Sequence, residues 1–196
     1  LLLNNDVDVI NPGWLREMVS HAIRPGIGAV GAKLLYPDGT IQHGGVTVGV
    51  GGVAGHQYLH HPRGDVGYFG QLVLARNITA VTGACLLLRR QSFQEVGGLD
   101  EISLPVAFND IDLCLKLVAR GYRNLWTPYA ELYHHESASR GSDLAGKKAA
   151  RFMAEVSVMR QRWGEVLDHD PYWNPNLALH VTEVSLAFPP RDPVIT

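Results

Sequence analysis

The chain has 196 residues, of which 46% are hydrophobic, so it is long enough to bury the core of one domain. Its 17 lysines and arginines and 19 aspartates and glutamates give a net charge of −2, which excludes the basic field that nucleic-acid binding requires. The cysteines, Cys85 and Cys114, lie in apolar surroundings without C-x-x-C spacing, which excludes a disulfide scaffold and predicts buried, reduced thiols.

The first residues predict a buried strand that ends in polar side chains. Leu1 to Leu3 form an apolar run without a cap or polar lead-in, so we expect the chain to be the C-terminal part of a longer domain. Asn4, Asn5, Asp6 and Asp8 follow at the carboxyl end of this strand, where an α/β sheet usually binds its ligand. Asp6 and Asp8 can share a divalent cation, or they can simply form a turn before the next helix.

A helix and a hairpin are predicted next. The helix is capped by Asn11 and stopped by Pro25, and its apolar residues form one stripe. The segments Gly28–Tyr36 and Ile41–Val48 have the composition of strands, and Pro37–Gly39 has that of the turn between them. This part of the chain is expected to be architectural.

The middle of the chain combines a long irregular segment with a second buried strand. Residues 56–77 carry three histidines and several aromatic residues without a clear period, which indicates a functional lid or, more simply, an exposed polar loop. Ala80–Arg89 then predicts a buried strand, in which Thr82 and Gly83 are small enough to allow a close approach to the backbone. A short helix is expected over Gln91–Val96.

The strongest helix signal begins at Asn109, a natural N-cap, and ends at Gly121. Its apolar residues recur at helical spacing: Ile111, Cys114, Leu115 and Val118. Asp110 and Asp112 therefore lie in the first turn, where the positive end of the helix favours an ionised carboxylate. Such a carboxylate suits a general base or a metal ligand, although acidic residues in a first turn are also common as favourable placement alone.

Two histidines stand at the end of a later strand. Short strands are predicted over Asn124–Trp126 and Ala130–His134, with a turn between them. His134 and His135 therefore occupy a second strand end, which is again a place where a site can be built.

The chain ends in a basic helix and a tail. The helix, over Leu144–Trp163, can attract an anionic membrane surface or present a solvated face. The sequence has neither an apolar run of about 18 residues nor a signal peptide, which predicts a soluble, intracellular chain. The prolines of the tail predict an extended segment, so we divide the chain into residues 1–165 and 166–196.

Taken in this order, the motifs closely resemble the C-terminal half of a glycosyltransferase family 2 catalytic domain. They are Asn-Asn-Asp-Val-Asp after a strand, then Thr-Gly-Ala-Cys, Gly-Gly-Leu-Asp-Glu, Phe-Asn-Asp-Ile-Asp at a helix start, and Tyr-His-His. The resemblance runs from Leu1 to about Trp163 and is closest to members that build bacterial cell-surface polysaccharides, including rhamnosyltransferase-like proteins. It implies an α/β GT-A fold with a mixed sheet flanked by helices, whose N-terminal Rossmann-like half is missing here.

The resemblance also implies a metal site and a base. Asp6 falls on the last acidic position of the family's D-x-D-type motif, Asp8 on the position of a further ligand in some members, and His134 at the spacing of a metal-binding histidine. The metal would be Mg²⁺ or Mn²⁺. Asp110 falls on the general base of the family's Glu-Asp motif, and Asp112, on another face of the helix, is left a supporting role.

Other positions are implied to contact the donor or the acceptor. They are Asn4, Asn5, Thr82, Gly83, Asn109 and His135. Asn4 and Asn5 stand where acidic residues are often found, and Asn109 replaces the usual glutamate. His135 competes with His134 as the metal ligand.

The implied reaction is an inverting transfer of a sugar from a nucleotide-diphospho-sugar donor to a hydroxyl of a glycan or lipid-linked acceptor. Asp110 would take the hydroxyl proton, and the metal would neutralise charge on the departing diphosphate. We expect a cytoplasmic enzyme, with peripheral association at the inner face of the membrane as an option. The chain alone is expected to be inactive, because the donor base and ribose bind upstream, and to self-associate through the strand edge at Leu1–Leu3.

Two other function classes compete with this interpretation. A metal-dependent phosphohydrolase would also place Asp and His ligands at strand ends, but it would more often need ligands for a second metal. A non-catalytic carbohydrate-binding or oligomerising module would use exposed aromatic residues, for which the candidates are Tyr58, Tyr68, Phe69, Tyr172 and Trp173. Phosphodiester hydrolysis without an acceptor would favour the first class, and metal-independent sugar binding the second.

Overall fold

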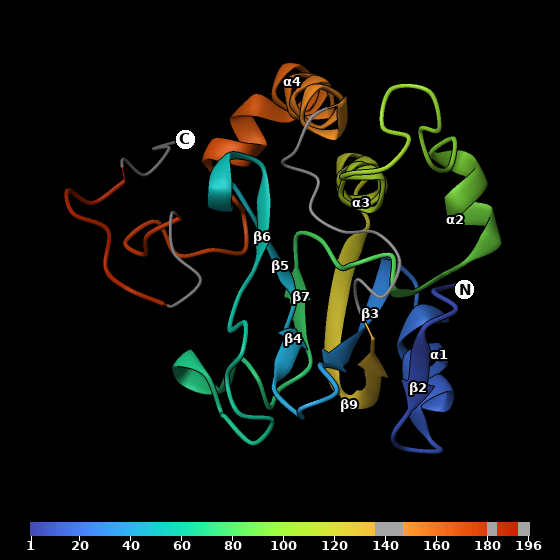
Figure 1. The fold of residues 1–196 in the computed structure, drawn as a ribbon. Coiled ribbons are helices and arrows are strands. Elements are labelled where there is room, and N and C mark those ends of the chain that lie inside the picture. The colour runs from blue at the N-terminus through green and yellow to red at the C-terminus, as the bar shows by residue number, and fades with distance from the viewer. Residues whose placement is uncertain (136–146, 180–183, 192–196) are drawn as a thin grey trace.

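A computed structural model describes residues 1–135, 147–179 and 184–191 and shows a mixed sheet flanked by helices (Figure 1). The main sheet has the strand order β1-β8-β3-β9-β2, with β4 beside β3 and β7 beside β9. Its strands are β1 (Leu2–Leu3), β2 (Val7–Val9), β3 (Ile27–Leu35), β4 (Ile41–His43), β7 (Arg76–Ile78), β8 (Cys85–Leu88) and β9 (Arg123–His134). Strands β3 and β9 run parallel and the other pairs antiparallel, which confirms the predicted fold class.

Helices and a small second sheet complete the described fold. They are α1 (Trp14–Ala22), α2 (Arg90–Glu95), α3 (Asn109–Ala119), α4 (Lys147–Asp168), the strands β5 (Val46–Val48) and β6 (Ala54–His56), and the 3₁₀ turns η1 (Val50–Gly52) and η2 (Tyr68–Gly70). The first residues of the predicted basic helix, 144–146, lie outside the described ranges. Among the helices that the structure describes, none combines the length and the hydropathy needed to cross a membrane.

Strand β3 is the centre of the core, because all nine of its residues are buried. Alternate side chains of a strand point to opposite faces of the sheet. On one face, Val30 and Ala32 pack in a cluster with Met18 of α1, and on the other, Ala29 belongs to a cluster with Leu115 of α3. Helix α4 lies next to α3 (Figure 1), and its Met159 belongs to the same cluster.

Helix α3 follows the predicted apolar spacing, but its N-cap is Phe108 and not Asn109. Phe108 has a φ of +62°, and its carbonyl accepts the Asp112 N–H at 2.8 Å, so Asn109 is the first helical residue. The preceding loop is held from α4, where the buried Glu155 Oε1 accepts the N–H groups of residues 106–107 at 2.9 and 3.2 Å. A contact from a distant helix therefore overrides the local capping signal.

The predicted cap of α1 is also wrong, and for a similar reason. Asn11 bridges an irregularity of β9, where its Nδ2 donates to Tyr129 O at 2.7 Å and its Oδ1 accepts the Glu131 N–H at 3.0 Å. The parallel pairing of β3 and β9 shifts at this point, so one strand with a bulge replaces the two predicted short strands. Helix α1 begins later, at Trp14.

The predicted hairpin holds only for its first half. Strand β4 pairs with β3 as expected, but the chain then leaves the main sheet at Gly45, whose φ is +105°. Val46–Val48 pairs with β6 in the second sheet instead. The left-handed conformation, which glycine adopts without strain, separates the two halves of the predicted strand.

The irregular segment 56–77 carries many exposed residues, as the polar-loop interpretation predicts, but it is also anchored to the sheet. Tyr58 and Leu72 are buried in the core. The buried Lys33 donates to Arg63 O at 2.6 Å, and Arg63 pairs with Glu131 at 2.7 Å.

The described part of the tail is not simply extended. Helix α4 continues to Asp168, so the division at 165/166 falls within it. Asp170 is buried and accepts the N–H groups of Val48 and Tyr172, both at 2.8 Å, and the hydroxyl of Thr79. Trp173 is also buried. This part of the tail therefore packs against the core next to the second sheet.

Strand β1 and the cysteines complete the comparison. β1 is an edge strand of the main sheet, with Leu1 and Leu3 51% and 44% exposed and Leu2 packed against the core, in agreement with the strand edge expected at Leu1–Leu3. Cys85 and Cys114 are buried and unbridged, and burial raises the pKa of each thiol to about 12. The prediction of buried, reduced thiols is confirmed.

Candidate active site

The polar segment after β1 lies beside the end of β9. Strand β2 pairs antiparallel with β9, and this register sets Val7 opposite His134. One residue on, the His135 N–H donates to the carbonyl of Asp6 at 2.9 Å. The two strand ends that the sequence singled out therefore meet in space.

Asn4, Asp6 and His134 converge on one ring nitrogen. The Asn4 amide donates to His134 Nε2 at 3.1 Å, so this nitrogen acts as an acceptor. Asp6 Oδ1 lies 3.3 Å from the same nitrogen, is buried, and has no hydrogen-bond donor among the described residues. Two atoms that offer electron pairs thus face each other, which is an arrangement that a cation would bridge. A carboxylate oxygen and an imidazole nitrogen fit Mn²⁺, and the oxygen also fits Mg²⁺.

Asp8 and His135 form a separate pair. Asp8 Oδ2 lies 2.8 Å from His135 Nε2, and the two side chains are 74% and 42% exposed. Within the described ranges, no group of three or more His, Cys, Asp or Glu side chains is arranged to hold a metal ion. Asp6, Asp8 and His134 therefore do not form a ready three-residue cluster, and Asn5 is exposed.

Asp110 lies at the start of α3 with its carboxylate held by backbone donors. Its Oδ2 accepts the Gly83 N–H at 2.7 Å and its Oδ1 the Ile111 N–H at 2.9 Å. Burial raises the pKa of Asp110 above the ordinary aspartate value, and hydrogen bonds from Gly83, Ile111 and Thr82 oppose this rise. A carboxylate with a raised pKa is a stronger proton acceptor than an exposed one.

Two consecutive residues join Asp110 to the Asn4 side of the site. The Gly83 N–H binds Asp110, and the carbonyl of Ala84 accepts the Asn4 N–H at 3.0 Å. Gly83 also permits the close approach, because a Cβ at this position would lie 3.3 Å from the Asp110 Cβ. Thr82 Oγ1 accepts the Ala84 N–H at 3.4 Å and so braces the same short segment.

Helix α4 supports the first turn of α3 from behind. Asp112 is fully buried, and its Oδ1 accepts hydrogen bonds from Arg162 Nη1 and Trp163 Nε1, both at 2.9 Å. Lys116 Nζ lies 2.8 Å from its Oδ2. Asp112 therefore ties two helices together, in agreement with the supporting role expected for it.

Sequence reasoning missed two residues that shape this site. Gln42 contacts His134, and Glu155 holds the loop before α3. Each carries a weak signal in retrospect: Gln42 is a polar residue within a predicted strand, and Glu155 is the single acid among residues 147–163 of the predicted basic helix.

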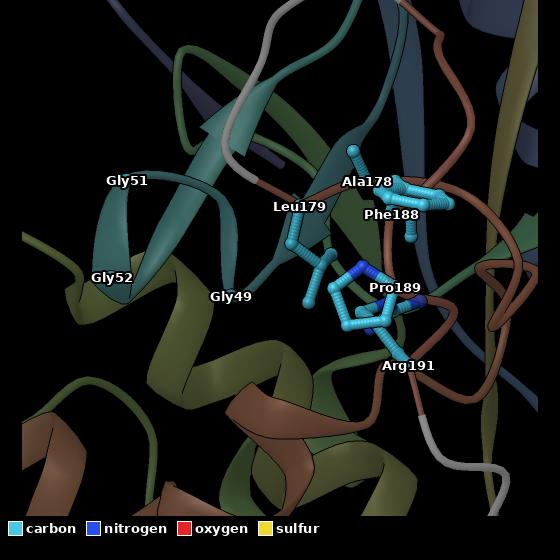
Figure 2. A pocket seen from close by; sticks show the side chains of 9 residues that line it. Gly49, Gly51, Gly52, Ala178, Leu179, Phe188, Pro189 and Arg191 are labelled. Atoms are coloured by element: carbon cyan, nitrogen blue, oxygen red, sulfur yellow. The ribbon is translucent and has the colours of Figure 1, made fainter.

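A pocket of about 400 Å³ lies elsewhere, between η1 and the tail (Figure 2). Its lining shares no residue with the candidate site: Gly49, Gly51, Gly52, Ala178, Leu179, Ala187, Phe188, Pro189 and Arg191. The Arg191 guanidinium donates to the carbonyls of Leu177, Asp168 and Asn174. The guanidinium is therefore engaged by the tail itself, and the pocket carries no catalytic group.

Comparison with known proteins supports the resemblance that the motifs indicate. The chain is 44% identical, over 98% of its length, to the O-antigen biosynthesis protein RfbC of Myxococcus xanthus. It is 28% identical, over 88% of its length, to an N-acetylglucosaminyl-diphospho-decaprenol L-rhamnosyltransferase of Mycobacterium tuberculosis. The chain is thus similar to a protein of O-antigen biosynthesis and to a rhamnosyltransferase. The resemblance to the C-terminal part of a family 2 glycosyltransferase domain, predicted from the motifs, is thereby confirmed.

The coverage of these glycosyltransferase relatives is partial. The chain spans 15% of the Myxococcus protein and 56% of the Mycobacterium protein. It is also 57% identical, over 96% of its length, to the protein y4gI of Sinorhizobium fredii, of which it spans 21%. No family model matches the chain.

Proposed function

We propose that the protein containing this chain is an inverting glycosyltransferase of bacterial surface glycan synthesis, and that this chain supplies its base and its metal ligands. The observation that carries the proposal is the Gly83–Ala84 segment. One of its residues binds the Asp110 carboxylate and the next binds Asn4, which neighbours His134 and Asp6. A base and a cation site on either side of one short segment are what an inverting transfer requires.

Asp110 is the proposed general base. In an inverting transfer the acceptor hydroxyl attacks the anomeric carbon from the face opposite the leaving group, and one carboxylate must take the hydroxyl proton. Positioned proton transfer of this kind contributes about 10²- to 10⁴-fold to the rate. The two backbone N–H groups on Asp110 hold the carboxylate in one orientation.

Asp6 Oδ1 and His134 Nε2 are the proposed ligands of Mn²⁺ or Mg²⁺. The buried, donor-free oxygen of Asp6 supports this assignment, since an unpaired carboxylate oxygen next to an imidazole lone pair is otherwise unfavourable. When bound, the metal would supply Lewis-acid stabilisation of the departing diphosphate. Asp8 is a weaker candidate because His135 already engages it.

The proposed substrates are a nucleotide-diphospho-sugar donor and a glycan or lipid-linked acceptor. The names of the Myxococcus and Mycobacterium relatives support this substrate class. We place the enzyme in the cytoplasm, at or near the inner face of the membrane. Because the base and ribose of the donor are held upstream in the resembled family, we expect this chain alone to bind nucleotide sugars weakly and to be inactive.

Replacement of Asp110 by Asn in the full-length enzyme tests the proposal. We expect turnover to fall by about 10²- to 10⁴-fold, because an amide cannot accept the hydroxyl proton. Donor affinity, measured by calorimetry with Mn²⁺ present, should not change. Asp168→Asn is the matched control, since the Asp168 side chain is exposed and pairs with Arg160, away from the proposed site.

Several outcomes would count against the assignment. Normal turnover of Asp110→Asn would refute the base. Hydrolysis of a phosphodiester by the wild-type protein without an acceptor would favour a phosphohydrolase, and sugar binding that ignores metal would favour a binding module.

A further inference from the structure

Gln42 lies directly behind His134 and contacts it twice. It is the middle residue of β4 and is only 4% exposed. Its Nε2 donates to the backbone carbonyl of His134 at 3.3 Å, and its Oε1 lies 2.7 Å from His134 Nδ1. One side chain therefore contacts both the backbone and the ring of the proposed metal ligand.

These two contacts determine which ring nitrogen of His134 carries the proton. A backbone carbonyl can only accept, so the amide nitrogen of Gln42 must face it, and the amide oxygen must then face the ring. An amide oxygen can only accept, so Nδ1 of His134 must be the protonated nitrogen. In the neutral ring, Nε2 therefore carries no proton, which agrees with the hydrogen bond that it accepts from the Asn4 amide.

We propose that Gln42 is a positioning residue that fixes His134 as the Nδ1–H tautomer and turns its bare Nε2 toward Asp6. The assignment of the tautomer rests on geometry alone. Its role, which is to present an unprotonated nitrogen to a divalent cation, rests on the proposed function. Outer partners of ligating histidines set the tautomer and ring orientation in metal sites generally, and their loss typically costs about 10- to 100-fold in metal affinity.

Because Gln42 is buried in the sheet, its side chain can hold the His134 ring in one orientation. Gln42 is held in a strand that pairs with the fully buried β3, so its backbone cannot shift without disturbing the core. Asp6 faces the ring from the opposite side, on the turn before β2. The ring is thus held between a rigid acceptor at Nδ1 and a carboxylate oxygen near Nε2.

The first arm of the test needs no metal. The full-length protein is labelled with ¹⁵N-histidine, and the ring nitrogens are recorded by NMR at about pH 8, well above the ordinary histidine pKa of about 6.5. The His134 signals are assigned by their loss in His134→Gln. We expect a protonated Nδ1 and a bare Nε2 in the wild type, and a mixed or reversed tautomer in Gln42→Met, which keeps the length of the side chain but removes the acceptor.

The second arm measures Mn²⁺ affinity by electron paramagnetic resonance with the same proteins. Gln42→Met should weaken binding by about 10- to 100-fold. Gln42→Glu keeps an oxygen that accepts from Nδ1 but loses the donor to the His134 carbonyl, so it should weaken binding less than Gln42→Met does. Gln57→Met is the matched control, because Gln57 is 1% exposed and its amide atoms have no hydrogen-bond partner within the described part of the chain. We expect this control to bind Mn²⁺ as the wild type does.

Two results would overturn the inference. One is a wild-type His134 protonated at Nε2, and the other is Mn²⁺ affinity in Gln42→Met equal to that of the wild type. Equal losses in Gln42→Met and Gln42→Glu would also overturn it, since they would indicate a general effect on the core. If the wild type bound no Mn²⁺, the metal part of the proposed function would fail, and the NMR arm would still decide the role of Gln42.

Discussion

The contact between α3 and α4 through Asp112 makes a quantitative prediction. Asp112 is fully buried and meets Arg162 Nη1 and Trp163 Nε1 at 2.9 Å and Lys116 Nζ at 2.8 Å. In Asp112→Ala, the indole N–H loses its acceptor and two cations lose their common partner. We expect the two helices to hold together less well and the protein to be less stable.

The magnitude follows from the burial of the partners. Breaking a buried ion pair costs about 3–5 kcal/mol. The Arg162 and Lys116 side chains are 34% and 22% exposed, and Arg162 keeps a 2.9 Å contact with Asp100, so both cations can regain water or another partner. We therefore expect the lower value, about 3 kcal/mol. For a chain of this size, that corresponds to a decrease in Tm of about 6–12 °C.

The assay is urea denaturation followed by tryptophan fluorescence, with a matched control on α4. Asp168→Ala breaks an Arg–Asp pair of similar length, at 2.7 Å, whose side chains are 41% and 59% exposed. Exposed pairs contribute about 0–1 kcal/mol. If the two variants lost stability to within about 1 kcal/mol of each other, burial would not be what makes the Asp112 contact strong.

Two further predictions concern the proposed site. Asp110 acts as a base only when it is deprotonated, and burial raises its pKa. In a plot of kcat/KM against pH, activity should therefore be lost on the acidic side with an apparent pKa above the ordinary aspartate value of about 3.9. An apparent pKa at or below that value would contradict the raised pKa of Asp110. Asp6→Asn should weaken Mn²⁺ binding, measured by electron paramagnetic resonance on the full-length protein. Loss of a residue that only supports a ligand costs about 10- to 100-fold in metal affinity, and loss of the ligand Asp6 should cost at least as much. Asp8→Asn should have a smaller effect because Asp8 pairs with His135, and the reverse order would move the ligand to Asp8.

Local pattern was sufficient for α3, β3 and the buried cysteines. The apolar spacing of α3 and the continuous apolar run of β3 are properties of adjacent residues, and each matches the structure to within one or two positions. The errors lie where a distant segment satisfies the backbone. Glu155 displaces Asn109 as the residue that organises the start of α3, and Asn11 bridges the bulge of β9 instead of capping α1.

The sequence by itself determined the fold class, the resemblance to a known family and the set of candidate residues, because these depend on the pattern and the order of motifs along the chain. Only the tertiary structure decided how the candidates pair. The pairing of β2 with β9 sets Val7 opposite His134. Asp6, on the turn before β2, and Asn4 then lie beside His134, whereas Asp8 pairs with His135 just after the end of β9. The partner behind His134, Gln42, lies 92 residues away and reaches it through the sheet. No spacing along the chain encodes that contact, because it exists only once the strands are paired.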